Sequence, residues 1–449
     1  VIEKLEYYID FGFGVLDAMV EVGVYILNSN SLTTLGTLDL RETENANEKA
    51  IETNSFQFID KKIFGLIPKS PLAYWISNSL LIRFQEKSFL TSTGWRAQIG
   101  LSTKDDFRFL RNIWESKNSS RFIPMAKGGE YARFWLDIDV AVNFEDQGFE
   151  LDEYLTGKYP YLKGNTDWIL HPESDYFSIG LTYTRRSSKG LSVRILQEGL
   201  MFSDMGRAIV KTDVTKDELF FMLGYMNSQF IRNTLSLFTS NIFEGGTINV
   251  LPAVKFNFND DLHKSISNSS FRITKILNKY AKGEEWSNSF ESPLLSKYAN
   301  QDFNDSLEKL ICVNEDDLRI IKEEYNTLNY NVSSIFDAEY KDGSEDYDWL
   351  PVINVEDEVK KFISYCFGLY IKRFDSNYIS KESLLKFNTD KYSQNDEIEF
   401  FEISLNEFNS DFIRCLTDYG VTEAFLSSVL NHLKFKSFYD YFCSNTYND

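Results

Sequence analysis

The feature that most constrains the fold of this chain is a change in hydrophobic periodicity near residue 257. Before it, residues 95–257 alternate short apolar runs with turn residues, a pattern typical of strands. After it, residues 258–449 carry longer segments whose apolar residues recur at helical spacing. The change predicts an α+β chain, in which a mixed α/β section precedes a mainly helical C-terminal section.

The same patterns predict the individual elements. Within the mixed section we expect strands in residues 140–148, 176–188, 191–206 and 247–257. The segment Glu218–Phe238 has helical spacing instead and predicts one helix or two. In the C-terminal section the expected helices are Phe271–Lys282, Asp316–Asn329, Val355–Phe374, Ile398–Asp418 and Thr422–Lys434. The acidic segment Asp342–Asp348 is expected to be a solvated loop.

Residues 1–94 contain too few elements for a separate layered domain. Leu5–Asp10 and Glu21–Leu27 are short apolar runs that predict strands, and Leu35–Arg41 is a candidate third strand. Glu42–Thr53 is a polar helix candidate. Two or three strands with one helix do not close a doubly wound sheet, so we expect this segment to belong to a larger unit.

Several classes of site are disfavoured by residue usage. The four cysteines are far apart in the sequence and show no paired spacing, which fits a reducing cytoplasm and argues against a disulfide framework or a zinc site. The three histidines do not cluster, so neither a histidine metal site nor a Ser-His-Asp triad is indicated. No apolar run approaches 20 residues, which gives no sign of a membrane span.

The net charge of −20 is distributed unevenly. Residues 258–449 hold 20 Lys and Arg against 35 Asp and Glu, a net charge of −15. In contrast, residues 96–133 hold 8 basic and 4 acidic residues, and residues 179–211 hold 6 and 2, so each stretch has a net charge of +4. Two local basic stretches in an acidic chain permit binding to a polyanion such as nucleic acid, although solvated surface explains each of them equally well.

Three segments in these basic stretches are candidate loops for binding DNA. The segment Gly100–Arg111 has a polar tip beside Phe107, Phe109 and Leu110. In the second segment, Gly-Gly beside a lysine allows positive φ and close approach to phosphate oxygens. The third segment, residues 185–190, has the composition of a loop tip. The candidate DNA-binding residues are Lys104, Arg108, Arg111, Lys127, Gly128, Gly129, Arg133, Arg185, Arg186 and Lys189. Ordinary hairpin turns with solvated cations remain the alternative for the second and third segments.

These segments also carry a family resemblance. GLSTKDDFRFLR followed by PMAKGGEYARFW resembles the start of the target-recognition region in adenine-specific DNA methyltransferases. The most similar members are the PglX enzymes of BREX phage-defence systems and the single-chain type IIG restriction-methylation enzymes. Further matching positions follow in order along nearly the whole chain: Asn227, Ser228, Gly245, Gly246, Thr247, Ile248, Leu251, Pro252, Ile363, Ser364, Tyr365, Gly368, Arg373 and Asp375. Arg373 lies one place later than the family pattern has it.

The resemblance implies three parts. Residues 1–94 would be the tail end of a methyltransferase α/β sheet and a linker, 95–257 a mixed α/β target-recognition domain that binds DNA, and 258–449 a mainly helical C-terminal domain. Members of the family bind S-adenosylmethionine through a glycine-containing loop and hold the flipped adenine with an Asn-Pro-Pro motif. None of the eight prolines here is adjacent to another, and no glycine-rich strand-to-helix loop lies near Val1. We therefore expect a chain that begins after the catalytic motif and is inactive alone.

The sequence thus predicts the recognition and C-terminal region of an S-adenosylmethionine-dependent adenine-N6 DNA methyltransferase in phage defence. No catalytic, cofactor or metal residue is assigned to this chain, and S-adenosylmethionine is expected only in the full-length enzyme. The expected partner is double-stranded DNA in the cytoplasm, with other BREX or restriction subunits as further partners and no membrane. Two alternatives remain open: a scaffold module that docks other defence subunits or a regulator, and the specificity region of a nuclease-fused type IIG enzyme.

Overall fold

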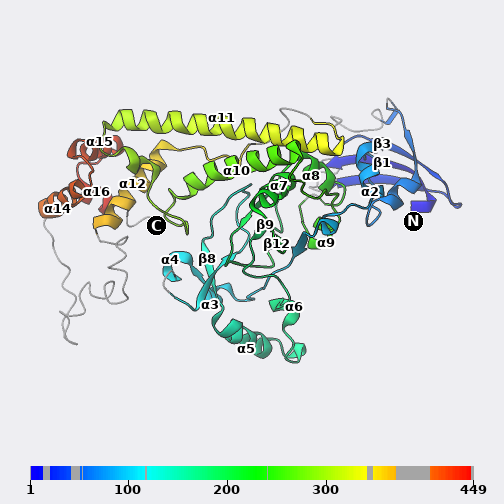
Figure 1. The fold of residues 1–449 in the computed structure, drawn as a ribbon, viewed down its shortest axis with the longest axis horizontal. Coiled ribbons are helices and arrows are strands. Elements are labelled where there is room, and N and C mark those ends of the chain that lie inside the picture. The colour runs from blue at the N-terminus through cyan, green and yellow to red at the C-terminus, as the bar shows by residue number, and fades with distance from the viewer. Residues whose placement is uncertain are drawn as a thin grey trace.

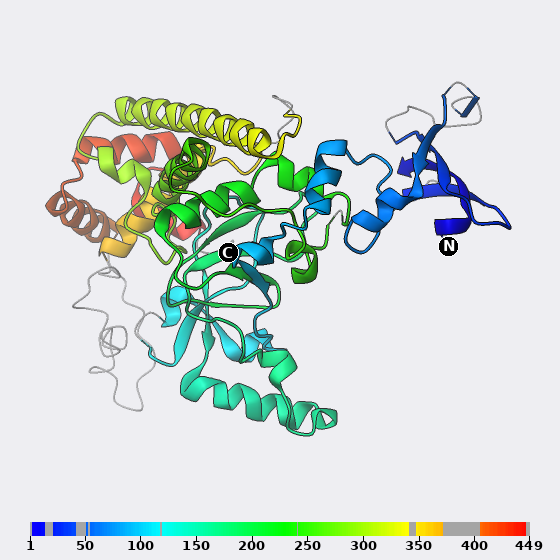
Figure 2. The ribbon, with the colours of Figure 1, turned by 45° about the vertical axis from the view of Figure 1, so that its right-hand side comes forward.

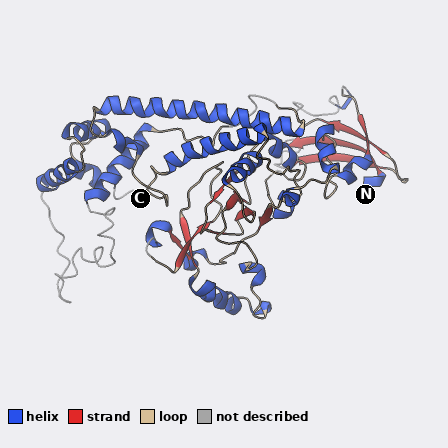
Figure 3. Cartoon of the chain, viewed as in Figure 1, coloured by secondary structure: helices blue, strands red, loops and turns tan. Residues whose placement is uncertain are grey.

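The computed structural model describes residues 2–13, 21–41, 51–52, 54–116, 119–239, 241–340, 347–370 and 405–445. These ranges form a mixed α/β fold with a helical C-terminal region, which confirms the fold class expected from the sequence (Figure 3). None of the helices within the described ranges has the length and apolarity needed to cross a membrane.

The N-terminal sheet forms a lobe that projects from the rest of the molecule (Figure 2). Its strands are β1 (Leu5–Phe13), β2 (Glu21–Leu27), β3 (Thr34–Asp39) and β4 (Gln57–Asp60), in the order β2-β1-β3-β4. The pair β1 and β3 is parallel, whereas the other two pairs are antiparallel. The three expected strands are confirmed, and the short β4 was missed. The polar helix candidate Glu42–Thr53 lies almost entirely outside the described residues.

A second sheet forms the centre of the molecule. Its strands are β5 (Arg96–Gln98), β9 (Gly180–Thr184), β10 (Val193–Leu196) and β12 (Gly206–Val210), in the antiparallel order β10-β9-β12-β5. Every residue of β9 and β12 is buried. Both faces of these two strands are therefore buried, and the polar residues among them, Thr182, Thr184 and Arg207, lie in the interior.

The third sheet lies in the lower lobe of Figure 1, next to the central sheet. Its strands are β6 (Leu110–Asn112), β7 (Phe122–Ala126), β8 (Val140–Asn143) and β11 (Met201–Phe202), in the order β11-β7-β8-β6. Short helices flank them: α3 (Asp106–Phe109), α4 (Ile113–Ser116), α5 (Phe149–Lys158) and α6 (Asp167–Leu170). A compact core that includes Phe109, Met125, Val142 and Leu151 joins this sheet to α5.

Two long helices run along the top of the molecule in Figure 1 and cover the central sheet together with two shorter ones. The four are α7 (Lys216–Met226), α8 (Gln229–Leu235), α10 (Asp261–Ala281) and α11 (Phe303–Phe336). The packing of α7 on α10 is close, because a Cβ at Gly224 would lie 2.2 Å from Ser270 Oγ. One hydrophobic core therefore continues across residue 257, while the expected domain boundaries there and at residue 94 stay predictions.

The remaining helices form a second bundle around α11, with a core of its own. They are α12 (Val355–Tyr370), α14 (Leu405–Asp418), α15 (Glu423–Leu433) and α16 (Phe438–Asn445). Shorter elements are α2 (Asn78–Gln85), α9 (Gly245–Ile248), η1 (Ile2–Lys4), η2 (Lys61–Leu66), η3 (Leu90–Thr93), η4 (Glu145–Gly148), η5 (Pro160–Leu162) and η6 (Leu294–Tyr298). The expected helices are confirmed within the described ranges, and Glu218–Phe238 is two helices, α7 and α8. Most of Asp342–Asp348 lies outside those ranges.

The prediction of a strand over residues 247–257 is wrong. Helix α9 occupies the first residues of this segment, and an isolated bridge between Phe89 and Pro252 is its only strand-like pairing within the described residues. The physical reason is Asn249, whose Oδ1 accepts a hydrogen bond of 2.8 Å from the backbone N–H of Ala97 on β5. The side chain of Asn249 thus takes up a backbone hydrogen bond at the edge of the central sheet, where the apolar pattern predicted a further strand.

Candidate nucleic-acid interface

The three candidate loops meet around one tight turn, Ser203–Gly206. The N–H of Asp204 donates to the carbonyl of Leu101 at 3.1 Å, and the N–H of Ser203 donates to the carbonyl of Ala126 at 3.0 Å. The N–H of Arg185 donates to the carbonyl of Met205 at 2.8 Å. Segments that are far apart in the sequence, such as those of Leu101 and Asp204, therefore lie side by side. We call this assembly the basic loop cluster. Its exposed or half-buried cations are Lys104, Arg108, Arg111, Lys127, Arg185, Arg186 and Lys189, with Arg121 beside them.

The Lys127-Gly128-Gly129 loop has the backbone geometry that the sequence predicts. Gly128 has φ of 106° and Gly129 has φ of 94°, both in the region that side chains disfavour. The loop is held from the inside by Arg194, which donates to the carbonyl oxygens of Gly128 at 2.9 Å and Glu130 at 3.0 Å. Burial lowers the pKa of Arg194 to about 10, so the guanidinium remains charged at neutral pH. The loop is therefore built in one conformation.

The side chain of Lys127 points toward the neighbouring loop. Its Nζ lies 2.6 Å from Oδ1 of Asp106, and the hydroxyl of Thr103 donates to the same carboxylate. Burial alone would raise the pKa of Asp106, but the hydrogen bonds from Lys127 and Thr103 outweigh it and hold that pKa below its ordinary value. The ion pair fixes the position of the ammonium while leaving 29% of the lysine side chain exposed.

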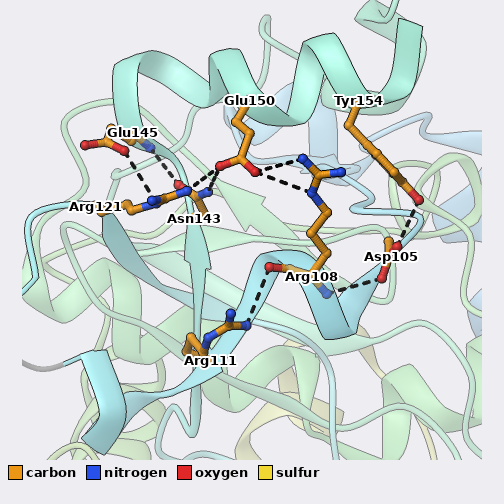
Figure 4. Close-up of polar contacts among 8 residues, drawn as sticks. All are labelled: Asp105, Arg108, Arg111, Arg121, Asn143, Glu145, Glu150 and Tyr154. Carbon is orange, nitrogen blue, oxygen red and sulfur yellow. Dashed lines mark hydrogen bonds and ion pairs between the residues drawn. The ribbon is translucent and has the colours of Figure 1, made fainter. Parts of the chain in front are cut away.

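Glu150 on α5 gathers the cations at the other end of the cluster (Figure 4). Arg108 Nη2 lies 3.0 Å from Oε1, Asn143 Nδ2 donates to Oε2 at 2.8 Å, and Arg121 Nη2 contacts Oε2 as well. The hydrogen bond from Arg108 is the largest of the contributions that lower the pKa of Glu150, and Asn143 and the charge of Arg121 add to it. Because both guanidiniums remain nearly half exposed, the carboxylate orients them without removing them from solvent.

Arg111 and Lys104 complete the first loop. Arg111 Nη1 donates to the carbonyl oxygens of Phe107 at 3.1 Å and Leu110 at 2.5 Å. It also lies 3.5 Å from the carbonyl oxygen of Arg108 (Figure 4), so its partners there are neutral. Lys104 is exposed and has φ of 55°, which turns the chain at the loop tip. Both side chains are accessible for contact with an anion.

The third loop, residues 185–190, separates into inward and outward cations. Arg185 is held by Glu244 Oε1 at 3.0 Å from Nε and 2.6 Å from Nη2, and the buried Arg207 binds the other oxygen of that carboxylate at 2.6 Å. Lys189 forms an ion pair with Asp348. Arg186 is exposed and lines a shallow depression with Ser187, Ser188, Asn241 and Ile242. Arg186 is thus the cation of this loop that is best placed to reach a ligand.

The prediction that Arg133 binds DNA is wrong, because its side chain is buried. It is only 2% exposed, and its guanidinium donates to the hydroxyls of Tyr131, at 2.8 Å from Nε, and Tyr325. The rings of Tyr131, Tyr325 and Trp349 lie 5.4–5.7 Å from its Cζ. Arg133 therefore links the mixed section to α11 and cannot face DNA in this fold. The aromatic residues on both sides of it in YARFW were the signal for burial.

The site also contains residues outside the ten candidates. Asn143 and Glu150 were not predicted from the sequence, and Arg121 was not among the ten, although the structure joins all three with Arg108. Arg121 lies in the basic stretch 96–133, which could have identified it. Glu150 lies in an acidic run, EDQGFELDE, and no sequence signal separates it from its solvated neighbours.

Comparison with known proteins gives a consistent assignment. No family model matches the chain. It is 25% identical over 395 residues to the adenine-specific methyltransferase BrxX of Escherichia coli O9:H4 (strain HS), covering 86% of this chain and 28% of that protein. It is 24% identical over 341 residues to the adenine-specific methyltransferase PglX of Lacticaseibacillus casei (strain Zhang), covering 69% and 27%.

This chain is similar to part of the PglX-type adenine-specific methyltransferases. The resemblance stated from the motifs is thereby confirmed. The chain spans only 28% and 27% of the length of the two curated relatives. Among solved structures, it matches the type IIL restriction-modification enzyme MmeI at 10% identity and a TM-score of 0.41, covering 76% of this chain and 44% of that one. It matches the type IIG restriction endonuclease BpuSI at 14% identity and a TM-score of 0.30, covering 76% and 45%.

Proposed function

We propose that this chain is the DNA target-recognition and C-terminal region of a PglX-like adenine-N6 DNA methyltransferase of phage defence. Its similarity to BrxX and PglX supports the enzyme class. The observation that carries the recognition role is the basic loop cluster, in which three cationic segments meet around the Ser203–Gly206 turn. Solvated hairpin tips would have no need to be joined in this way.

The cluster has the donors that DNA recognition requires. Arginine forks at base edges read sequence, and lysines and further donors position the protein on phosphates. The guanidinium groups of Arg111 and Arg186 are exposed, and their described contacts include no carboxylate. We therefore assign base reading to these two arginines. Lys104, Lys127 and the exposed backbone of Gly129 suit phosphate contact. Glu150 and Asp106 hold the remaining cations in fixed positions.

The charge distribution supports the same orientation. Residues 258–449 carry a net charge of −15 and would be repelled by DNA, which favours approach from the basic loop cluster. We further propose that the protein acts in the cytoplasm, where its DNA would be, and that duplex DNA is its partner. Docking of other BREX or restriction subunits is a second candidate role for the acidic helices.

We assign no S-adenosylmethionine site to this chain, because it contains no Asn-Pro-Pro sequence to hold an adenine beside that cofactor. In the whole enzyme the cofactor would supply the methyl group. The chain alone should neither bind the cofactor nor methylate DNA. Calorimetric titration should show no heat of stoichiometric binding, and a one-to-one micromolar isotherm would contradict this assignment.

The DNA assignment is tested with Lys127→Ala and Arg186→Ala in this chain, measured by fluorescence anisotropy on a mixed duplex pool at several salt concentrations. Arg319→Ala is the matched control, since it removes an equal charge from an exposed arginine on α11. Lys127→Ala should weaken binding to all duplexes and lower the salt slope by about one unit. On a duplex selected by the wild-type chain, Arg186→Ala should cost about 1–3 kcal/mol.

Arg319→Ala should leave both quantities unchanged. If all three variants bind as the wild type does, the basic loop cluster is not the DNA interface. The scaffold role would then be the better account.

A further inference from the structure

Phe107 is the most solvent-exposed large hydrophobic side chain among the described residues, at 95%. It lies in the single turn of α3, between Asp106 and Arg108. The other phenylalanine of the same turn, Phe109, is 0% exposed. Phe107 therefore lacks the stabilisation that Phe109 gains from burial.

The exposure of Phe107 is imposed by contacts on both sides of it. Asp105 caps α3 by accepting from the N–H of Arg108 at 3.2 Å, and its other oxygen accepts from the hydroxyl of Tyr154 at 2.9 Å (Figure 4). Asp106 is tied to Lys127 at 2.6 Å. The carbonyl of Phe107 itself accepts from Arg111 at 3.1 Å. The backbone that carries the ring is therefore anchored on both sides of Phe107.

The surroundings of the ring match one kind of ligand. Lys104, Arg108 and Arg111 are exposed around the same turn, whereas the two adjacent carboxylates are directed to partners within the protein. A flat apolar ring among cations suits a polyanion that also offers flat apolar faces. Nucleobases in a phosphate backbone have both properties, and proteins insert apolar side chains between base steps or stack aromatic rings on bases.

We propose that Phe107 is a wedge that stacks on a nucleobase and opens one base step when duplex DNA binds the basic loop cluster. This inference rests on the proposed function and adds a base-contacting residue to it. The anchored turn of α3 would hold the ring in place before DNA arrives, so that little conformational entropy is lost on insertion. Lys104 and Arg108 would contact the phosphates that flank the opened step.

The test uses this chain and a duplex that it selects from a random pool. 2-Aminopurine is placed at each position in turn, because its fluorescence rises when a base loses its stacking partner. The wild type should give a rise at one step. Phe107→Ala should abolish that rise and weaken binding about tenfold, with an unchanged salt slope, since stacking releases no counterions. Phe107→Trp should retain wild-type affinity, because its ring also stacks.

Phe58→Ala is the matched control, since Phe58 lies on β4 in the N-terminal lobe and is 66% exposed. It should behave as the wild type. The wedge is refuted if Phe107→Ala has the same affinity and the same 2-aminopurine fluorescence as Phe58→Ala. It is also refuted if Phe107→Ala changes the salt slope and leaves the fluorescence unchanged. The proposed function stands in both cases. If the wild type selects and binds no duplex at all, the proposed function fails, and the wedge fails with it.

Discussion

Two sets of arginines in this protein have opposite surroundings although each of the two basic stretches of the sequence contributes one arginine to each set. Arg133 and Arg194 are about 2% exposed and are held by hydroxyls and carbonyl oxygens of the interior. Arg111 on β6 and Arg186 at a loop tip are exposed. The buried pair joins the central sheet to α11 and to the Lys127–Gly129 loop, and the exposed pair is left for a ligand. Positive charge in a sequence therefore indicates binding only after the buried arginines have been identified.

The largest expected effect comes from the buried set. Arg194→Ala would leave the carbonyl oxygens of Gly128 and Glu130 and the hydroxyl of Thr184 without their donor. We expect a loss of about 3 kcal/mol in the free energy of unfolding. The same substitution at Arg186 should change it by less than about 0.5 kcal/mol. Urea denaturation of the two variants measures the difference, and equal midpoints would erase the distinction between the two sets.

The next effect tests how the loops are joined to the interior. A Cβ at Gly206 would lie 2.3 Å from the backbone nitrogen of Gly128 and 2.4 Å from the carbonyl oxygen of Ala126. Gly206→Ala should therefore destabilise the protein by about 2–3 kcal/mol, because backbone must shift to admit the methyl group. Gly246→Ala is the control, since nothing lies within 4 Å of its added Cβ. A wild-type urea midpoint for Gly206→Ala would show that the turn does not hold the loops together.

A smaller effect is expected at the exposed ion pairs, where solvent screens the charges. Glu150→Gln should lower the free energy of unfolding at pH 7 by less than about 1 kcal/mol. The pKa of Glu150 is lower in the folded protein, chiefly through the hydrogen bond from Arg108. Its stabilising contribution is therefore present above the ordinary glutamate pKa of about 4.3 and is lost as the pH falls through the lower folded-state value. The difference between the urea midpoints of variant and wild type should thus begin to narrow as the pH falls below about 4.3, and a difference that stays constant through acid titration would exclude this origin.

Part of this account could be predicted from the sequence, because it depends on local pattern. The apolar periodicity of Glu218–Phe238 located α7 and α8, and Gly128-Gly129 predicted positive φ. Contacts between distant residues could not be predicted in this way. The side chain of Asn249 pairs with the sheet edge where a strand was expected over 247–257. Arg133 is buried against the hydroxyl of Tyr325, which is nearly 200 residues away in the sequence. The role of Glu150 likewise depends on Arg108 and Arg121, which only the fold brings to it.

The central claim is that three separate loops form one DNA-binding surface, and hydrogen–deuterium exchange of this chain with and without duplex DNA tests it most directly. Residues 100–111, 127–130 and 185–190 should gain protection together, because the Ser203–Gly206 turn joins them. The acidic helices α14, α15 and α16 should exchange at the same rate in both samples. Protection confined to those helices, or to one of the three loops without the others, would contradict the account.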